Sequence, residues 1–223
     1  MSSANSLLIL SAGRGIGLDG FHKLNLVAPS TGETILARYV RQLSDAVTVV
    51  VGYRAPEMMA QHPTLNYVYN HSWFETGSAF SAAMGLSKAP VIVVPSDLFL
   101  DENAAKGVST AAGNVIFASS TENRPQNSVN IELDGDTVVD IYTGPKRHGN
   151  DPEFKGIVRI EDLDLLEDLA KTCEANPAAP FSDCLNLHRE AFRVIVLDGD
   201  VTEINAVAEY VEFFNRDRDR ADP

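Results

Sequence analysis

The first half of the chain alternates short apolar, β-branched runs with stretches of helical period. The apolar runs predict buried strands at 7–10, 47–51, 65–69 and 90–94. The stretches between and after them predict helices at 31–43, 55–61 and 78–86. Because strands joined by helical crossovers run parallel, the pattern predicts an α/β fold in which a mostly parallel sheet lies between helices on both faces.

From about residue 114 on, the pattern of apolar and polar residues changes. Shorter alternating runs predict strands at 115–118, 129–133, 138–142 and 156–160. We interpret them as a small β-rich insertion that continues the main sheet. Beyond it, the chain predicts a strand at 192–197 and helices at 160–174, 181–190 and 206–214. Since no linker is long enough to separate domains, residues 1–223 are expected to form one domain with halves at 1–113 and 114–223.

The charge balance limits the partners of this chain. It has 18 Lys and Arg residues against 31 Asp and Glu, a net charge of −13, and no basic cluster. Nucleic acids and anionic membranes bind to concentrated positive charge, so we expect neither as a partner. The two cysteines, Cys173 and Cys184, are too few for a zinc site made of cysteines. The apolar run at 7–10 is too short for a signal segment or a membrane span, so we expect a cytoplasmic monomer or homodimer.

The most informative segment is the glycine-rich loop LSAGRGIGLDGFHK at residues 10–23, which begins at the end of the first predicted strand. Its four glycines can present backbone N–H groups as a nest for phosphate oxygens, and Arg14 and Lys23 add positive charge. The loop lacks the Gly-Lys-Ser/Thr ending of a P-loop. Because ligands bind at the carboxyl edge of open α/β sheets, we expect this loop to meet the loops at 70–78 and 95–101 there.

Two dinucleotide-binding patterns occur in the sequence without their usual context. Residues 15–20 match the GxGxxG fingerprint, but the segment after them looks extended and does not begin a helix. Tyr142 and Lys146 match the Tyr-x-x-x-Lys pair of short-chain dehydrogenases, which requires a helix, yet residues 144–145 are Gly-Pro. A dehydrogenase is therefore the less favoured alternative.

The glycine-rich loop resembles the signature of nucleotidyltransferases with a GT-A-type, Rossmann-like α/β fold, whose first strand ends in Leu-x-Ala-Gly-x-Gly and leads to a Lys. Here LSAGRG occupies 10–15 and the lysine is Lys23. Further stretches resemble the family in the same order: VVVGY at 49–53, YNHSWFETGSAFS at 69–81, VVPSD at 93–97 and TEIN at 202–205. The chain is most similar to the small single-domain members that activate phosphocholine, sugar phosphates, phosphonates or a molybdenum cofactor.

The resemblance implies Mg²⁺-dependent transfer of a nucleoside monophosphate to a small phosphorylated or phosphonate acceptor, with CMP from CTP as the favoured case and pyrophosphate as the product. It implies that Lys23 and Arg14 are the catalytic residues, acting on the phosphates, and that Asp97 and Asn205 bind the metal. The residues implied to bind the nucleotide are Ser11, Ala12, Gly13, Arg14, Gly15, Lys23, Gly77, Ser78 and Ser81. The first half of the chain would then bind the nucleotide and the second half the acceptor.

The second half must also offer a cation to the phosphate of such an acceptor. The candidates are Arg124, Lys146, Arg147 and Lys155. Each of them can equally be an ordinary solvated side chain. We rank Lys146 and Lys155 first as acceptor-binding residues.

Two positions depart from the pattern of this family. Gly17 stands where an arginine is usual, which leaves Arg14 and Lys23 as the cations for the triphosphate. Asn205 replaces the usual aspartate, so the metal would gain a neutral oxygen ligand, and Asn205→Asp is expected to tighten its binding. A nucleotide-binding regulatory domain that has lost catalysis is therefore a second alternative. Apart from the resemblance, Asp97 and Asn205 could be ordinary helix-start residues.

Overall fold

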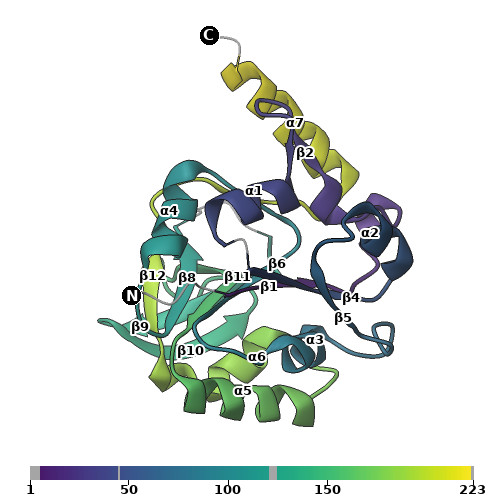
Figure 1. The fold of residues 1–223 in the computed structure, drawn as a ribbon. Helices are drawn as coiled ribbons and strands as arrows, with labels where there is room; N and C mark the ends of the chain where they lie inside the picture. Colours follow the sequence, from purple (N-terminus) through teal and green to yellow (C-terminus); the bar gives the residue numbers. More distant parts are fainter. Residues whose placement is uncertain (1–5, 45, 121–124, 222–223) are drawn as a thin grey trace.

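The computed structural model describes residues 6–44, 46–120 and 125–221. In this part of the chain nine strands form one sheet in the order β5-β4-β1-β6-β11-β8-β12-β10-β9, with helices on both faces (Figure 1). The strands of this sheet are β1 (Ser6–Ser11), β4 (Ala46–Val51), β5 (Asn66–Tyr69), β6 (Val91–Pro95), β8 (Val115–Ser119), β9 (Val129–Asp134), β10 (Thr137–Thr143), β11 (Glu153–Ile160) and β12 (Arg193–Val196).

The strands of the first half pair in parallel, β5 with β4, β4 with β1, and β1 with β6, as the sequence predicts. In the second half, β11 runs antiparallel to both β6 and β8, while β8 and β12 are parallel. The antiparallel pair β9 and β10 lies at the far edge of the sheet, and β9 also pairs with β11. The predicted β-rich insertion is therefore a continuation of the main sheet.

The helices divide between the two faces of the sheet (Figure 1). One face is covered by α1 (Ile35–Gln42), α2 (Ala55–Gln61) and α4 (Glu102–Thr110), and the other by α3 (Ser78–Gly85), α5 (Leu163–Ala175) and α6 (Phe181–Leu187). Along β1, Leu7 and Ile9 pack into one apolar core and Leu8 into the other, because successive side chains of a strand point to opposite faces. The structure confirms the three-layer α/β fold. None of the helices in the described residues is both long and apolar enough to cross a membrane.

The helix predicted from residue 31 begins later, at Ile35. The residues ahead of it form an antiparallel pair, β2 (Val27–Ala28) with β3 (Glu33–Thr34). Thr34 ends that pair and caps the helix, because its Oγ1 accepts a hydrogen bond from the backbone N–H of Ala37 at 3.1 Å. The cap therefore fixes where α1 starts. The prediction placed the start too early because it took the polar residues from Thr31 on as the opening of the helix, although the apolar period itself begins at Ile35.

Two short strands that the sequence does not predict form a second pairing, β7 (Leu98–Leu100) with β13 (Val201–Glu203). Just beyond this pair, the backbone N–H of Ile204 donates to the carbonyl oxygen of Asp97 at 2.9 Å. The last helix, α7 (Val207–Ala221), follows directly. The pairing thus brings the segment after β6 beside the segment before α7, although the two are far apart in the sequence. Single-turn 3-10 helices complete the described structure at η1 (Ile16–Leu18), η2 (Lys23–Asn25) and η3 (Arg189–Ala191).

Candidate active site

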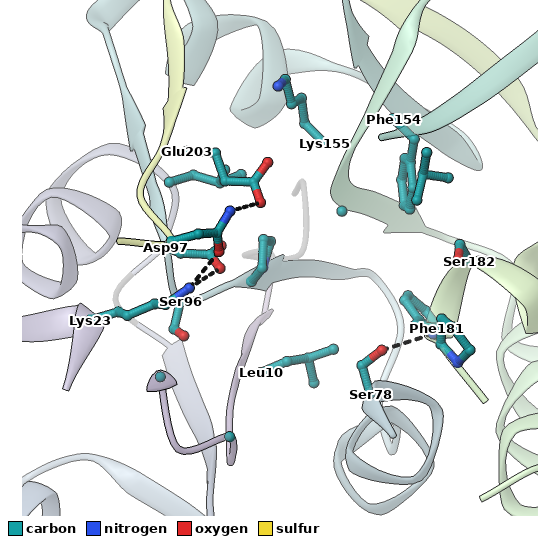
Figure 2. A pocket seen from close by; sticks show the side chains of 18 of the residues that line it. Leu10, Lys23, Ser78, Ser96, Asp97, Phe154, Lys155, Phe181, Ser182 and Glu203 are labelled. Carbon is teal, nitrogen blue, oxygen red and sulfur yellow. Dashed lines mark hydrogen bonds and ion pairs between the residues drawn. The ribbon is translucent and has the colours of Figure 1, made fainter. Parts of the chain in front are cut away.

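A cavity of about 480 Å³ opens at the carboxyl ends of β1 and β6. The loops at 10–23 and 95–101 both line it, as predicted, and Ser78 at the start of α3 adds a residue from the third expected loop. The charged side chains of one wall lie near one another in Figure 2: Lys23, Asp97 and Glu203. The carboxyl edge of the sheet is therefore where the predicted loops meet and where the predicted residues Lys23 and Asp97 lie.

Lys23, Asp97 and Asn205 meet at one point of the cavity. The Lys23 ammonium donates to Asp97 Oδ2 at 2.8 Å and to Asn205 Oδ1 at 2.7 Å. The lysine and aspartate side chains are only 14% and 18% exposed. The three residues come from η2, from the segment between β6 and β7, and from the segment after β13, so the tertiary fold brings the predicted lysine and the two residues expected to bind a metal to one place.

The Asn205 segment is held in place by two carboxylates. Glu209 Oε2, from the first turn of α7, accepts hydrogen bonds from the backbone N–H groups of Asn205 at 2.6 Å and Ala206 at 3.1 Å. Glu203 Oε1 accepts from Asn205 Nδ2 at 2.6 Å. Although Glu203 is partly open to solvent, desolvation at the cavity wall and the nearby Asp97 carboxylate raise the pKa of its carboxyl group. Asn205 is thus fixed at both its backbone and its side chain.

The oxygen atoms of Asp97 and Asn205 are suited to a hard divalent cation. Both already hold the Lys23 ammonium, so they point at a common position that a cation can take when the lysine moves. Within the described residues no group of three or more His, Cys, Asp or Glu side chains forms a metal cage. Mg²⁺ is usually held by one or two carboxylates together with substrate phosphates, so this small donor set fits Mg²⁺.

The glycine-rich loop contributes backbone to the cavity wall. Ser11, Gly13 and Gly15 line the cavity, and a Cβ atom added at Gly13 would meet no atom within 4 Å. Gly15 adopts a left-handed conformation, with a φ of 61°, which disfavours other residues there. Arg14 is not among the lining residues, because its guanidinium lies over the Tyr53 ring at 5.7 Å from the ring centre.

Ala12 also supports the loop from behind. It is buried, its carbonyl oxygen accepts from the backbone N–H of Tyr53 at 3.0 Å, and it does not line the cavity. The loop thus places Ser11, Gly13, Gly15 and Lys23 at the cavity, while the structure puts Arg14 and Ala12 outside its lining.

Gly17 has a structural reason for being glycine. A Cβ atom at this position would lie 2.2 Å from the carbonyl oxygen of Asn205 and 3.3 Å from Ala206 Cα. The glycine-rich loop therefore packs directly against the segment that carries Asn205, and the arginine usual at this position has no room. The close packing of these two segments therefore explains why glycine replaces the usual arginine at this position.

We expect Gly17→Ala to lower kcat/KM by about 10- to 100-fold, because the added methyl group must push the Asn205 segment away from Lys23 and Asp97. Steady-state kinetics together with the thermal unfolding midpoint measure the effect. The matched control is Gly149→Ala, where an added Cβ meets nothing within 4 Å. Equal activity of the two variants would show that this contact does not position the site.

The stretch at 69–81 contributes less than the sequence predicts. Ser78 lines the cavity, but its hydroxyl already accepts a hydrogen bond from the backbone N–H of Phe181 at 2.8 Å. Gly77 packs against the segment before α6, with its N–H donating to the carbonyl oxygen of Pro177 at 2.8 Å. Ser81 is buried and accepts from Asn70 Nδ2 at 3.1 Å. Gly77 and Ser81 do not line the cavity, and their contacts instead hold the loop and α3 in place.

The far end of the cavity combines one cation with an apolar wall. Lys155 forms an ion pair with Glu153 at 2.7 Å, and these side chains are only 6% and 5% exposed. Phe154 and Phe181 face the same space from the side opposite Lys23 (Figure 2). A smaller cavity of about 290 Å³ shares Lys155 and Glu153 and continues toward α7. This end of the cavity has the space and the cation that an acceptor would need.

A bulge in β11 explains how Lys155 reaches the cavity. The register against β8 shifts between Phe154 and Ile157, and Lys155 and Gly156 lie within that shift. Gly156 takes a φ of 72° and packs closely on Pro95 at the end of β6. Bulges of this kind re-aim side chains, and here the re-aimed side chain is the lysine.

The other candidate cations of the second half lie elsewhere. Lys146 does not line the cavity, and its ammonium approaches the Gly149 carbonyl oxygen at 3.4 Å. Arg147 forms ion pairs with Glu132 and Asp140. Arg124 lies outside the described residues. Of the two lysines ranked first, the structure therefore brings Lys155 into the cavity and does not bring Lys146.

The dehydrogenase alternative is wrong on structural grounds. Tyr142 lies in β10, where its hydroxyl accepts from the backbone N–H of Arg147 at 2.8 Å and donates to Asp151. Lys146 follows in an irregular segment, so no helix places it on the same face as Tyr142. The GxGxxG match at 15–20 likewise includes only the single turn of η1 and starts no α-helix.

Several lining residues carry no sequence signal of their own. No motif marks Glu153, Phe154 or Phe181 in the sequence. The bulge in β11 directs the first two at the cavity, and the packing of α6 directs Phe181 there. Glu203 stands in the recognised stretch at 202–205 but could equally be an ordinary helix-start residue. Its register opposite Leu98 is what places it at the wall.

Comparisons with known proteins agree with this fold. Residues 7–179 match the family model described as the MobA-like NTP transferase domain. No curated protein matches the sequence at a significant level. The CTP:phosphocholine cytidylyltransferase of Streptococcus pneumoniae is similar in structure, with a TM-score of 0.77 and 15% identity over 96% of this chain and 99% of that chain.

Two further solved structures share the fold over nearly their whole length. The inositol-1-phosphate CTP transferase of T. maritima has a TM-score of 0.71 at 15% identity, covering 97% of each chain. UDP-glucose pyrophosphorylase, complexed with UDP-glucose, has a TM-score of 0.69 at 13% identity, covering 97% of this chain and 99% of that chain. At these identities the likeness shows a common fold.

Proposed function

This chain belongs to the MobA-like NTP transferase family, and we propose that it transfers CMP from CTP to a small phosphorylated or phosphonate acceptor and releases pyrophosphate. The observation that carries the proposal is the convergence of Lys23, Asp97 and Asn205 in a cavity with a glycine-rich loop at one end and Lys155 at the other. This arrangement offers separate places for a triphosphate and for an anionic acceptor.

The proposed reaction is a displacement at the α-phosphorus of the nucleotide. An oxygen of the acceptor forms a new bond to this phosphorus, the bond to the oxygen bridging to the β-phosphorus breaks, and that oxygen leaves with pyrophosphate. Because the acceptor is already ionised near neutral pH, the reaction needs no nucleophile or general base from the protein. The protein has to align two anions and offset their repulsion.

Each group at the cavity has a part in that task. Lys23 donates hydrogen bonds to the oxygens of the α-phosphate, where negative charge develops in the transition state. The backbone of Gly13 and Gly15 faces the space for the β- and γ-phosphates. Asp97 and Asn205 would hold Mg²⁺, which would neutralise phosphate charge and orient the triphosphate.

The charges of the cavity support the need for a divalent ion. The described lining contains the carboxylates Asp97, Glu153 and Glu203 against the ammonium groups of Lys23 and Lys155. This balance is not positive, so a triphosphate and an acceptor phosphate would add to an already anionic space. A divalent cation offsets that repulsion.

The acceptor would bind at the Lys155 end. The Lys155 ammonium has three donors, one of which Glu153 can occupy, so donors remain for a phosphate or phosphonate. Phe154 and Phe181 would pack against the apolar part of a small acceptor. Cytosine as the base is supported by two of the similar structures, which are named as CTP-dependent transferases.

The experiment that tests the proposal is a pyrophosphate-release screen of CTP, UTP, GTP and ATP against phosphate and phosphonate acceptors, with Mg²⁺ and with EDTA. We expect release only with Mg²⁺ and an acceptor, and fastest with CTP. Release with another triphosphate would replace CTP while retaining the reaction class. Saturable triphosphate binding without release for any acceptor would favour the regulatory alternative, which the neutral Asn205 already suggests.

A further inference from the structure

The side-chain amide of Asn205 has one defined orientation in the site. Lys23 Nζ lies 2.7 Å from one end of the amide and Glu203 Oε1 lies 2.6 Å from the other. An ammonium group only donates and a carboxylate only accepts, so the end at Lys23 must be the oxygen and the end at Glu203 the NH₂ group. The chemistry of the two neighbours therefore decides which way the amide faces.

Such orientation matters at this position because asparagine replaces aspartate. A carboxylate presents an oxygen on either side, whereas an amide turned by 180° would present its NH₂ group to Lys23 and to a metal ion. Glu209 holds the backbone N–H groups of Asn205 and Ala206, which fixes the main chain but leaves the side-chain amide free to turn. Among the described contacts of Asn205, the bond from Nδ2 to Glu203 is the one that selects the orientation independently of Lys23.

We infer that Glu203 is a positioning residue that keeps Asn205 Oδ1 facing the position that Lys23 Nζ now occupies between it and Asp97 Oδ2, so that an asparagine can serve where a carboxylate is usual. The inference rests on the proposed function, in which Asp97 and Asn205 hold the metal. Glu203 is itself anchored by the β7–β13 pairing, in register opposite Leu98. Its negative charge also polarises the amide, which makes Oδ1 a stronger ligand for a cation.

This pairing changes what Asn205→Asp should do. The charge of the new carboxylate would favour a cation, but one of its oxygens would stand where Nδ2 now lies, 2.6 Å from Glu203 Oε1. Two carboxylates at that distance repel each other. An aspartate at this position should therefore perform well only when residue 203 carries no carboxylate, so the effects of the two positions depend on each other.

The test measures Mn²⁺ binding by electron paramagnetic resonance in the wild type, Glu203→Ala, Asn205→Asp and the double variant. With Asn205 present, Glu203→Ala should weaken Mn²⁺ binding by about 10-fold or more. In the Asn205→Asp background there is no amide to orient, so the same Glu203→Ala change should cause no loss or a gain. Glu203→Gln should stay within about threefold of the wild type, because the glutamine oxygen can still accept from Asn205 Nδ2.

Controls separate this effect from lost charge and lost folding. Glu167→Ala removes one exposed carboxylate from α5, so it matches the change in net charge, and thermal unfolding follows the stability of every variant. An equal loss from Glu203→Ala in both backgrounds, or no loss with Asn205 present, overturns the positioning role and leaves the proposed function intact. If the wild type binds Mn²⁺ no better than Asp97→Ala, the metal site itself is wrong and the inference fails with it.

Discussion

Replacing Asp97 by alanine should abolish Mg²⁺-dependent pyrophosphate release, with kcat/KM lower by about 10³-fold or more. Asp97 supplies a carboxylate in contact with Lys23, and its Oδ2 shares that ammonium with Asn205 Oδ1. Without it, the neutral amide of Asn205 would be left to hold a divalent cation beside a triphosphate. Because Asp97 is charged and Asn205 is neutral, we expect Asp97 to contribute most of the affinity for the metal.

The measurement is pyrophosphate release at increasing Mg²⁺, together with Mn²⁺ binding, for the wild type and Asp97→Ala. Asp136→Ala is the matched control, because it removes an exposed carboxylate from the turn between β9 and β10. We expect the control to keep wild-type turnover. If turnover resists both EDTA and Asp97→Ala, the reaction uses no metal at this site, and Asp97 is then an ion-pair partner of Lys23.

Lys23→Ala should lower kcat/KM by about 10²-fold or more while Mn²⁺ binding is kept or tightened. The ammonium group is the donor that we place at the reacting phosphorus, so its loss removes charge stabilisation in the transition state. In the free protein it also lies between the oxygens of Asp97 and Asn205, where a cation would bind. Removing it should therefore free those oxygens, which is the opposite of the effect of Asp97→Ala on binding.

Single-turnover kinetics and Mn²⁺ titration of the same protein distinguish these two effects. Lys88→Ala serves as the control, because this lysine is exposed and does not line the cavity. Wild-type turnover of Lys23→Ala would remove the lysine from the mechanism. Weakened Mn²⁺ binding in that variant would instead mean that Lys23 supports the metal ligands in the folded protein.

The sequence determined the elements whose signals are local. Short apolar runs, rich in β-branched residues in β4 and β6, placed β1, β4, β5 and β6, and the structure keeps them parallel with helices between them. The glycine-rich loop, Lys23 and Asp97 could be assigned to one edge because the carboxyl ends of parallel strands coincide. Asn205 could be placed only by its resemblance to a family pattern, since nothing near it in the chain points to the cavity.

The tertiary structure decided the rest, because it depends on pairings between distant segments. The three-residue strands β7 and β13 are too short to show a period, yet their pairing joins Asp97 to the Asn205 segment and sets Glu203 at the cavity wall. The bulge in β11 selects Lys155 over Lys146, and both lysines look alike in the sequence. Local periodicity reports which face of an element is buried, whereas the direction of a single side chain follows from register and packing across the whole fold.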